Sequence, residues 1–235
     1  MLTRRHIRVK VMQCIYALTH SQDDTLEKQV KFLKYSIDNM YTLYLLMLSL
    51  LIELQSKAEE QVKLSSNSYL GNLTDNQPNK DKFVANKLLL QIVNNKLLRE
   101  ELSKRKLNNW YLNEEYVKLI YKEVVASDYY NAYMSNTNSS YKEDKELIVE
   151  LYKNIIAPNE KIYDYFEDDK LTWIDDIPIV NTFLLKLLKK TSEDEIDSYF
   201  LPTLLKDDDD MVYAKQLLTK TLLNDALYVK EIEGK

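Results

Sequence analysis

Four basic side chains near the start of the chain are the residues best suited to bind a charged ligand. Arg4, Arg5, Arg8 and Lys10 lie within the first ten residues, and the first acidic residue is Asp23. The whole chain carries a formal net charge of -5, but the potential near a surface follows the charges close to it. Arginine can also donate two parallel hydrogen bonds to a phosphate. The cluster therefore predicts a site for an anion, and a phosphate backbone is the anion that we expect.

The residues that follow predict how the cluster is presented. Apolar residues recur at spacings of four, three and four, which places them on one helical face: Ile7, Val11, Cys14 and Leu18. We expect a helix over residues 4–20 with Thr3 as its N-cap. A second apolar set lies on roughly the opposite side: Val9, Met12 and Tyr16. A helix that is apolar on two sides is normally buried among other helices, so we expect only its ends to reach water.

Two other readings of the basic cluster stay open. Arg4 and Arg8 could pair with acids of a neighbouring helix, or the charges could simply keep the end of the chain soluble. A membrane-surface helix needs a polar face opposite its apolar face, and apolar residues on both sides argue against it. No membrane partner is expected.

Residues 4–16, which read Arg-Arg-His-Ile-Arg-Val-Lys-Val-Met-Gln-Cys-Ile-Tyr, resemble the opening helix of the bacterial transcription antitermination factor NusB. The pattern of that family is two arginines, a spacer, Ala-Arg and then Gln-x-Leu-Tyr, and the match runs without gaps. Residues 207–218, with the later apolar positions Leu222, Leu227 and Ile232, resemble a later helix of the family. That helix begins after acidic residues with an aromatic residue and alanine.

The chain also departs from the family pattern. Ile7 stands where the family usually has alanine, and residues 21–206 separate the two helices that contain the similar stretches, so the chain resembles a member with a long insertion. Further helices would follow in the family, and the sequence therefore resembles a truncated NusB. If those helices are missing, we expect the apolar side of the last helix to cause self-association.

The resemblance implies a function in transcription regulation that rests on assembly and not on catalysis. In the family, the basic end of the first helix meets a single-stranded RNA element called boxA. The ribosomal protein NusE packs alongside, and the complex helps RNA polymerase to resist termination. We expect phosphate contacts from the four basic residues and base contacts from His6 and Gln13, although Gln13 could equally point inward. Tyr213 is a candidate RNA or partner contact.

Composition favours an all-α multi-helix bundle in the cytoplasm. Only 2 glycines and 4 prolines occur, which leaves few residues for the tight turns of a β-fold. The single cysteine, Cys14, fits a reducing compartment, and we expect no signal peptide. The longest uncharged apolar stretch, residues 39–52, is too short to span a bilayer and reads as part of a core helix.

Helical patterns cover most of the chain, and we divide it into a basic RNA-binding helix (1–20), a helical insertion (21–206) and a later NusB-like helix (207–235). A polar linker is expected near residues 65–81, and a second irregular stretch at 134–140. The expected helices after the first are 25–64, 83–93, 96–107, 113–126, 141–156, 160–166, 178–190, 192–200 and 210–232.

No cofactor, metal site or catalytic residue is expected. Glycine-rich phosphate loops and metal-protease or paired-cysteine motifs are missing. The acidic run 207–210 is typical of a helix cap. In an Asp-rich metal-dependent transferase, such residues would instead bind a hard cation through their oxygens. Most of the 18 tyrosines read as half-buried core residues with their hydroxyls in water. Three classes therefore remain: an RNA-binding factor, a protein-interaction module with a basic arm, and the transferase.

Overall fold

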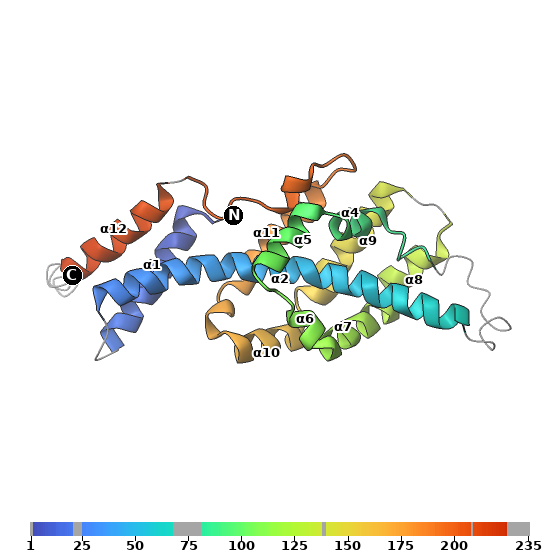
Figure 1. Cartoon of the computed structure of the whole chain (residues 1–235), viewed down its shortest axis with the longest axis horizontal. Helices are drawn as coiled ribbons and strands as arrows, with labels where there is room; N and C mark the ends of the chain where they lie inside the picture. The colour runs from blue at the N-terminus through green and yellow to red at the C-terminus, as the bar shows by residue number, and fades with distance from the viewer. Residues whose placement is uncertain (1, 21–24, 68–80, 138–139, 208, 225–235) are drawn as a thin grey trace. The chain divides into compact units, whose positions relative to one another are not determined.

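The computed structural model describes residues 2–20, 25–67, 81–137, 140–207 and 209–224 (Figure 1). All regular elements among these residues are helices, and the only β-type contact among them is an isolated parallel bridge between Leu2 and Leu205. The expected all-α multi-helix bundle is confirmed. The α-helices are α1 (Arg4–His20), α2 (Leu26–Asn67), α4 (Lys87–Val93), α5 (Lys96–Lys104), α6 (Asn109–Leu112), α7 (Glu114–Ala126), α8 (Asp128–Ser135), α9 (Tyr141–Leu151), α10 (Glu160–Asp169), α11 (Ile177–Lys190) and α12 (Asp210–Leu223). A π-helical turn η1 (Tyr152–Ile156) and two 3-10 turns, η2 (Leu171–Trp173) and η3 (Asp197–Phe200), complete the described elements.

The chain divides into two compact units, which differ from the expected division at residues 20 and 206. Unit 1 comprises Met1–Tyr41 and Pro202–Lys235, and unit 2 comprises Thr42–Leu201. Residues 21–41 and 202–206, expected in the insertion, thus belong to unit 1. Most of the expected linker and the end of the last expected helix lie outside the described residues.

In unit 1, α1 packs against α12, and the backbone N–H of Leu2 donates to the Leu204 carbonyl at 2.8 Å. The predicted face of α1 is buried at Ile7, Val11 and Cys14, which are at most 2% exposed. The prediction that the second apolar side is also buried was wrong. Its residues, Val9, Met12 and Tyr16, are 40%, 62% and 65% exposed. In the described part of unit 1, α1 is therefore covered on one side only.

In unit 2, the middle of α2 is buried on every side. Residues 43–51 are all at most 7% exposed, whichever way their side chains point. In Figure 1, α4, α5 and α9 lie on one side of this segment and α6, α7 and α10 on the other. An 18-residue window of α2 has a mean hydropathy of 1.4, enough to cross a membrane by length and composition, but 78% of that window is buried. Such burial is expected of a core helix, which agrees with the prediction for residues 39–52.

Two expected helices are shorter than predicted because capping residues stop them. Asn86 accepts a hydrogen bond from Leu89 N–H at 3.0 Å, so α4 begins at Lys87 and not at Phe83. At the end of α5, Lys106 has a φ of 55°, a left-handed conformation that ends the helix before Leu107. Helix α8 was not predicted, and Ser127 caps it by accepting from Tyr130 N–H.

The predicted helix over residues 192–200 was wrong, since only the 3-10 turn η3 forms there. Side chains from elsewhere use its backbone carbonyls. Gln91 donates to the Ser192 carbonyl at 3.1 Å, and Asn95 donates to the Asp197 carbonyl at 2.8 Å. A carbonyl that already accepts a tertiary hydrogen bond has less need of a helical partner.

The tyrosines of the core keep the expected structural role, but their hydroxyls are not all in water. Tyr44 and Tyr152 are fully buried. The hydroxyl of Tyr44 donates to the Phe200 carbonyl at 2.8 Å, and that of Tyr152 donates to Asn181 Oδ1 at 2.7 Å. Burial raises the pKa of Tyr152 well above its usual value, so the phenol stays a donor.

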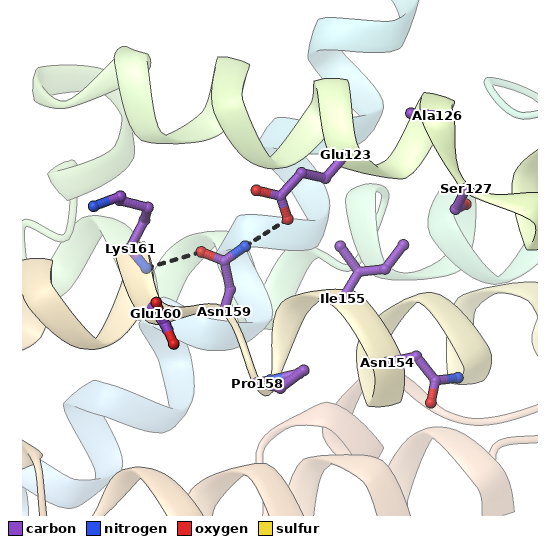
Figure 2. Close-up of a pocket in the computed structure, with 9 residues that line it drawn as sticks. All are labelled: Glu123, Ala126, Ser127, Asn154, Ile155, Pro158, Asn159, Glu160 and Lys161. Atoms are coloured by element: carbon purple, nitrogen blue, oxygen red, sulfur yellow. Dashed lines mark hydrogen bonds between the residues drawn. The ribbon is translucent and has the colours of Figure 1, made fainter.

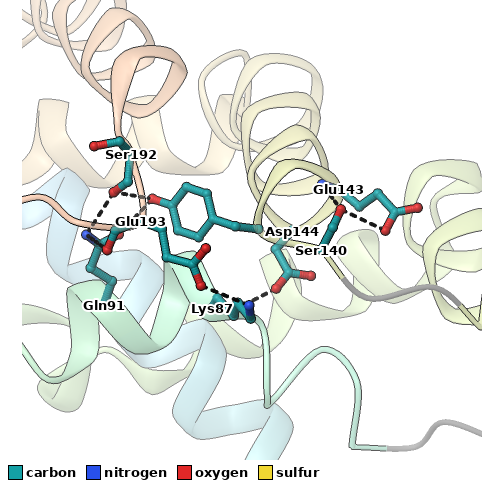
Figure 3. Close-up of polar contacts among 8 residues, drawn as sticks. Lys87, Gln91, Ser140, Glu143, Asp144, Ser192 and Glu193 are labelled. Atoms are coloured by element: carbon teal, nitrogen blue, oxygen red, sulfur yellow. Dashed lines mark hydrogen bonds and ion pairs between the residues drawn. The ribbon is translucent and has the colours of Figure 1, made fainter.

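A buried carboxylate joins α4, α8 and α9. Asp144 is 1% exposed and accepts from Lys87 N–H at 2.8 Å (Figure 3). It also accepts from the Tyr133 hydroxyl of α8 at 2.7 Å. The Lys87 ammonium pairs with Glu193 at 2.9 Å. Burial and the Asp144 charge raise the pKa of Tyr133, which keeps its hydroxyl protonated. One side chain therefore satisfies buried donors from two other helices.

We expect Asp144→Ala to lower the free energy of unfolding by about 2–3 kcal/mol, because two buried donors lose their acceptor. Denaturant unfolding followed by circular dichroism measures the change. The control is Asp168→Ala, an exposed aspartate of α10. Equal stability of the two variants would show that the buried network contributes nothing.

The thiol of Cys14 is 1% exposed, and burial raises its pKa to about 11. Only the thiolate reacts with a disulfide reagent, and about one thiol in a thousand is ionised at pH 8. We expect no reaction with dithionitrobenzoate over minutes in the native protein and one equivalent in denaturant. Rapid stoichiometric reaction without denaturant would contradict the burial.

Candidate nucleic-acid interface

The side chain of His6 caps the first turn of α1. The Ile7 N–H donates to the Thr3 carbonyl at 3.1 Å, and the Thr3 N–H donates to His6 Nδ1 at 3.3 Å. The bond to His6 is one half of a capping box, with histidine in place of the usual glutamate. Burial, the Arg5 charge and the N-terminus lower the pKa of His6, which favours its neutral form. His6 thus serves the helix start, and only its Nε2 is left for the predicted base contact.

Arg4 connects α1 to α12. Its Nε donates to Asp210 Oδ1 at 3.2 Å, and Asp210 is 1% exposed whereas the Arg4 side chain is 61% exposed. The other oxygen of Asp210 accepts from Asp207 N–H at 3.3 Å. The hydrogen bond and the charge of Asp210 raise the pKa of Arg4. One of the predicted phosphate-binding arginines therefore also neutralises a buried carboxylate.

Tyr213 lies between two of the arginines. The guanidinium carbon of Arg4 is 5.6 Å from the centroid of the Tyr213 ring, and Arg8 Nε donates to the Tyr213 hydroxyl at 3.1 Å. A cation over an aromatic face and a hydrogen bond to its hydroxyl fix both guanidinium groups against α12. The structure thus brings together three of the predicted site residues, although 205 positions separate Arg8 from Tyr213.

Arg5 and Arg8 are the cations best placed to meet a ligand. Both are exposed, and Arg8 uses only its Nε in the bond to Tyr213. Arg5 forms no ion pair or hydrogen bond with the residues that the structure describes. On the helix they share the exposed side with Met12 and Tyr16. The surface therefore combines two guanidinium groups with an exposed aromatic ring.

The prediction for Lys10 as a surface phosphate contact was wrong, because Lys10 is 3% exposed and already has a partner within the chain. It lies near the buried Cys14, whose pKa its charge lowers slightly against the larger effect of burial. Gln13 is half-buried and also has an interaction partner within the chain. On the helix, Lys10 lies on roughly the opposite side from Arg5.

Sequence reasoning missed a second pair of cations in unit 1. The Lys34 ammonium of α2 lies beside the Lys215 ammonium of α12, and this proximity lowers the pKa of Lys215. Neither lysine forms an ion pair within the described part of the chain. Because 181 residues separate the two, no local pattern could have revealed them. An anion between these ammonium groups would relieve their repulsion.

The predicted acidic runs do not form a metal centre in the described residues. Across residues 2–20, 25–67, 81–137, 140–207 and 209–224, no group of three or more His, Cys, Asp or Glu side chains is placed to hold a metal ion. Asp210 is engaged by Arg4, and Asp208 lies outside the described residues.

A cavity of about 600 Å³ lies between α7 and the segment that joins η1 to α10 (Figure 2). Its polar groups bond to one another: Asn159 donates to Glu123 at 2.8 Å and accepts from Lys161 N–H at 3.1 Å. The side chain of Asn159 is thus used to cap α10. We assign this cavity no chemistry.

The fold and this surface define an all-α protein with a basic, partly aromatic face on unit 1. No protein-family model, no curated protein and no solved structure matches the chain.

The variants Arg4→Ala and Arg5→Ala separate structural from ligand-binding arginines. Arg4→Ala leaves a buried carboxylate without its cation, so we expect a lower midpoint of thermal unfolding. Arg5→Ala removes only an exposed charge and should leave the midpoint unchanged. Circular dichroism during heating measures both, and equal midpoints would contradict a structural role for the Arg4–Asp210 pair.

Proposed function

We propose that this protein binds single-stranded RNA as a transcription antitermination factor similar to NusB. One observation carries the proposal. The two stretches that resemble NusB lie far apart in the sequence, yet α1 and α12 pack against each other and share Arg4, Arg8, Asp210 and Tyr213. A chance resemblance in two separate stretches gives no reason for them to meet.

The charge distribution supports the choice of an anionic ligand. Unit 1 has 12 Lys and Arg against 11 Asp and Glu, a net charge of +1, whereas unit 2 has 20 against 26, a net charge of -6. Among the described basic residues of unit 1, Arg5, Arg8 and Lys34 are exposed. A phosphate backbone would be attracted to unit 1 and repelled by unit 2.

In this proposal, the residues that position the RNA backbone differ from those that contact its bases. Arg5 and Arg8 hold phosphates, and Lys34 with Lys215 offers a second phosphate position. Tyr16 is 65% exposed and can stack with an unpaired base, since every base offers a π-face. His6 keeps one ring nitrogen for a base edge. Arg4 and Tyr213 mainly orient the surface.

The proposed role is the assembly of a complex in the cytoplasm. The protein would hold boxA-like RNA together with NusE, as part of an antitermination complex with RNA polymerase. No catalytic step belongs to this role.

A protein-interaction module with a basic arm is the second candidate. In this candidate the basic arm docks on an acidic partner, and the exposed side chains of Val9, Met12 and Tyr16 would suit an apolar protein surface. The Arg4–Asp210 pair is instead the pairing with a neighbouring helix that we named as another reading of the basic cluster. It predicts indifference to RNA sequence. For the transferase, the described residues offer no metal-binding group.

Fluorescence anisotropy of a boxA-like RNA and a scrambled RNA, across a salt series and with or without NusE, tests the proposal. We expect selective binding that NusE strengthens. Each of Arg5→Ala and Arg8→Ala should reduce the slope of log K against log salt by about 0.7, the value for one phosphate contact on a single strand. Arg4→Ala is unsuitable, because it would also alter the fold.

The matched control is Lys186→Ala, which removes an exposed cation from α11 in unit 2 and should leave the slope unchanged. Equal affinity for both RNAs, with no effect of NusE, would favour the protein-interaction module. An unchanged slope in both arginine variants would remove α1 from the RNA site.

A further inference from the structure

A second cavity lies within unit 2, between α2, α5 and the segment that leads into α6. Its volume is about 300 Å³, the lower end of the range for small-ligand sites. Helix α2 contributes Ser49, Ile52 and Glu53. The other lining residues are Arg99, Leu102, Leu107, Asn108, Trp110 and Tyr111. All of these positions belong to one unit, so the cavity depends on no contact with unit 1.

Glu53 is the unusual residue in this cavity. Its side chain is half-buried, and burial raises the pKa of its carboxyl group. Its carboxylate forms no hydrogen bond or ion pair with the residues that the structure describes. Most partly buried carboxylates have such a partner, because removal from water disfavours the charge. A bound cation would supply the missing partner.

Arg99 does not fill that role, although it lines the same cavity. Its Nε donates to the Val93 carbonyl at 2.5 Å, close to the end of α4, and no ion pair joins it to Glu53. Arg99 is exposed. It therefore lies at the edge of the cavity and leaves the carboxylate available.

The walls suit an aliphatic chain that ends in a positive charge. Ile52, Leu102 and Leu107 provide apolar surface in the cavity that Glu53 also lines. Trp110 is 2% exposed, and its indole N–H donates to the Leu46 carbonyl at 2.8 Å, so the ring is fixed. Aromatic rings beside a carboxylate favour ammonium groups through their electron-rich faces.

The mouth of the cavity indicates that the ligand belongs to a larger molecule. Tyr111, which lines the cavity, is 79% exposed, and the next residue in the chain, Leu112, is 66% exposed. Large exposed apolar side chains are typical of protein-binding surfaces, where tyrosine is enriched. The net charge of unit 2 is -6, so its expected partner is basic.

We propose that this cavity binds a lysine side chain of a basic partner polypeptide, with the aliphatic stem against Ile52, Leu102 and Leu107 and the ammonium group on the Glu53 carboxylate. Tyr111 and Leu112 contact the residues that flank the lysine. The site is independent of the RNA surface on unit 1.

The test uses the full chain labelled with ¹⁵N and an acetylated Gly-Leu-Lys-Leu-Gly amide as the probe, at neutral pH and without RNA. We expect the indole N–H signal of Trp110 to shift with peptide concentration, while that of Trp173, which lies outside the cavity, stays in place. The indole signal that disappears in Trp173→Phe belongs to Trp173, and the remaining one therefore belongs to Trp110. Replacing the lysine of the peptide by norleucine should weaken binding about tenfold, the effect of losing one charged hydrogen bond.

Glu53→Gln preserves the shape of the side chain and should weaken binding of the lysine peptide about tenfold, with no effect on the norleucine peptide. The matched control is Glu115→Gln, which makes the same charge change at an exposed position of α7. Tyr111→Ala removes a ring that is 79% exposed, and it should weaken binding of both peptides, because Tyr111 contacts the residues beside the lysine in this proposal. Arg5→Ala should leave peptide binding unchanged, which separates this proposal from the RNA proposal.

Three results would overturn the proposal. The first is that the Trp110 signal of the wild-type protein does not shift. This result would also overturn the proposal if the Arg99→Ala variant did bind the peptide, because Arg99 would then occupy the site. The second is equal binding of the lysine and norleucine peptides. The third is binding of n-butylammonium as tight as that of the peptide, which would assign the cavity to a small amine.

Discussion

The burial of α2 is the constraint on which unit 2 depends. Residues 43–51 have apolar side chains in nearly every direction, and an α-helix with no polar face is stable in water only if other elements surround it. The remaining helices of unit 2 are short, and most have one buried face. Their role follows from the central segment: α4, α5 and α9 cover one side, and α6, α7 and α10 cover the other (Figure 1).

Polar contacts then decide where the short helices begin and end. Asn86, Asn95 and Ser127 cap helices with their side chains, and Asp144 satisfies donors of two further helices. Buried polar groups need partners, so each of these contacts removes a cost that apolar packing alone would leave. The helix boundaries of unit 2 are therefore set by hydrogen bonds, whereas its central packing is set by apolar area.

The two proposed sites have opposite charge and different geometry. On unit 1, the Arg4–Asp210 pair and Tyr213 orient exposed arginines on an open surface, as an extended phosphate backbone requires. On unit 2, a single carboxylate lies in a cavity with apolar walls, which suits one cationic side chain. A protein with both could hold an RNA and a basic protein at the same time.

The sequence alone determined the helical class, the long core helix and the position of α1, because these depend on composition and on apolar periodicity along a continuous stretch. Through a resemblance in two distant stretches, it also predicted Arg4, Arg8 and Tyr213 as contact residues for RNA or a partner. Only the tertiary structure decided that Lys10 is buried, that Met12 and Tyr16 are exposed, and that residues 192–196 are not helical. The same holds for the Lys34–Lys215 pair and for the unpaired carboxylate of Glu53. Helical periodicity shows which residues share a face, but which face is covered, and which carbonyl or charge finds a partner, depends on elements that are distant in the chain.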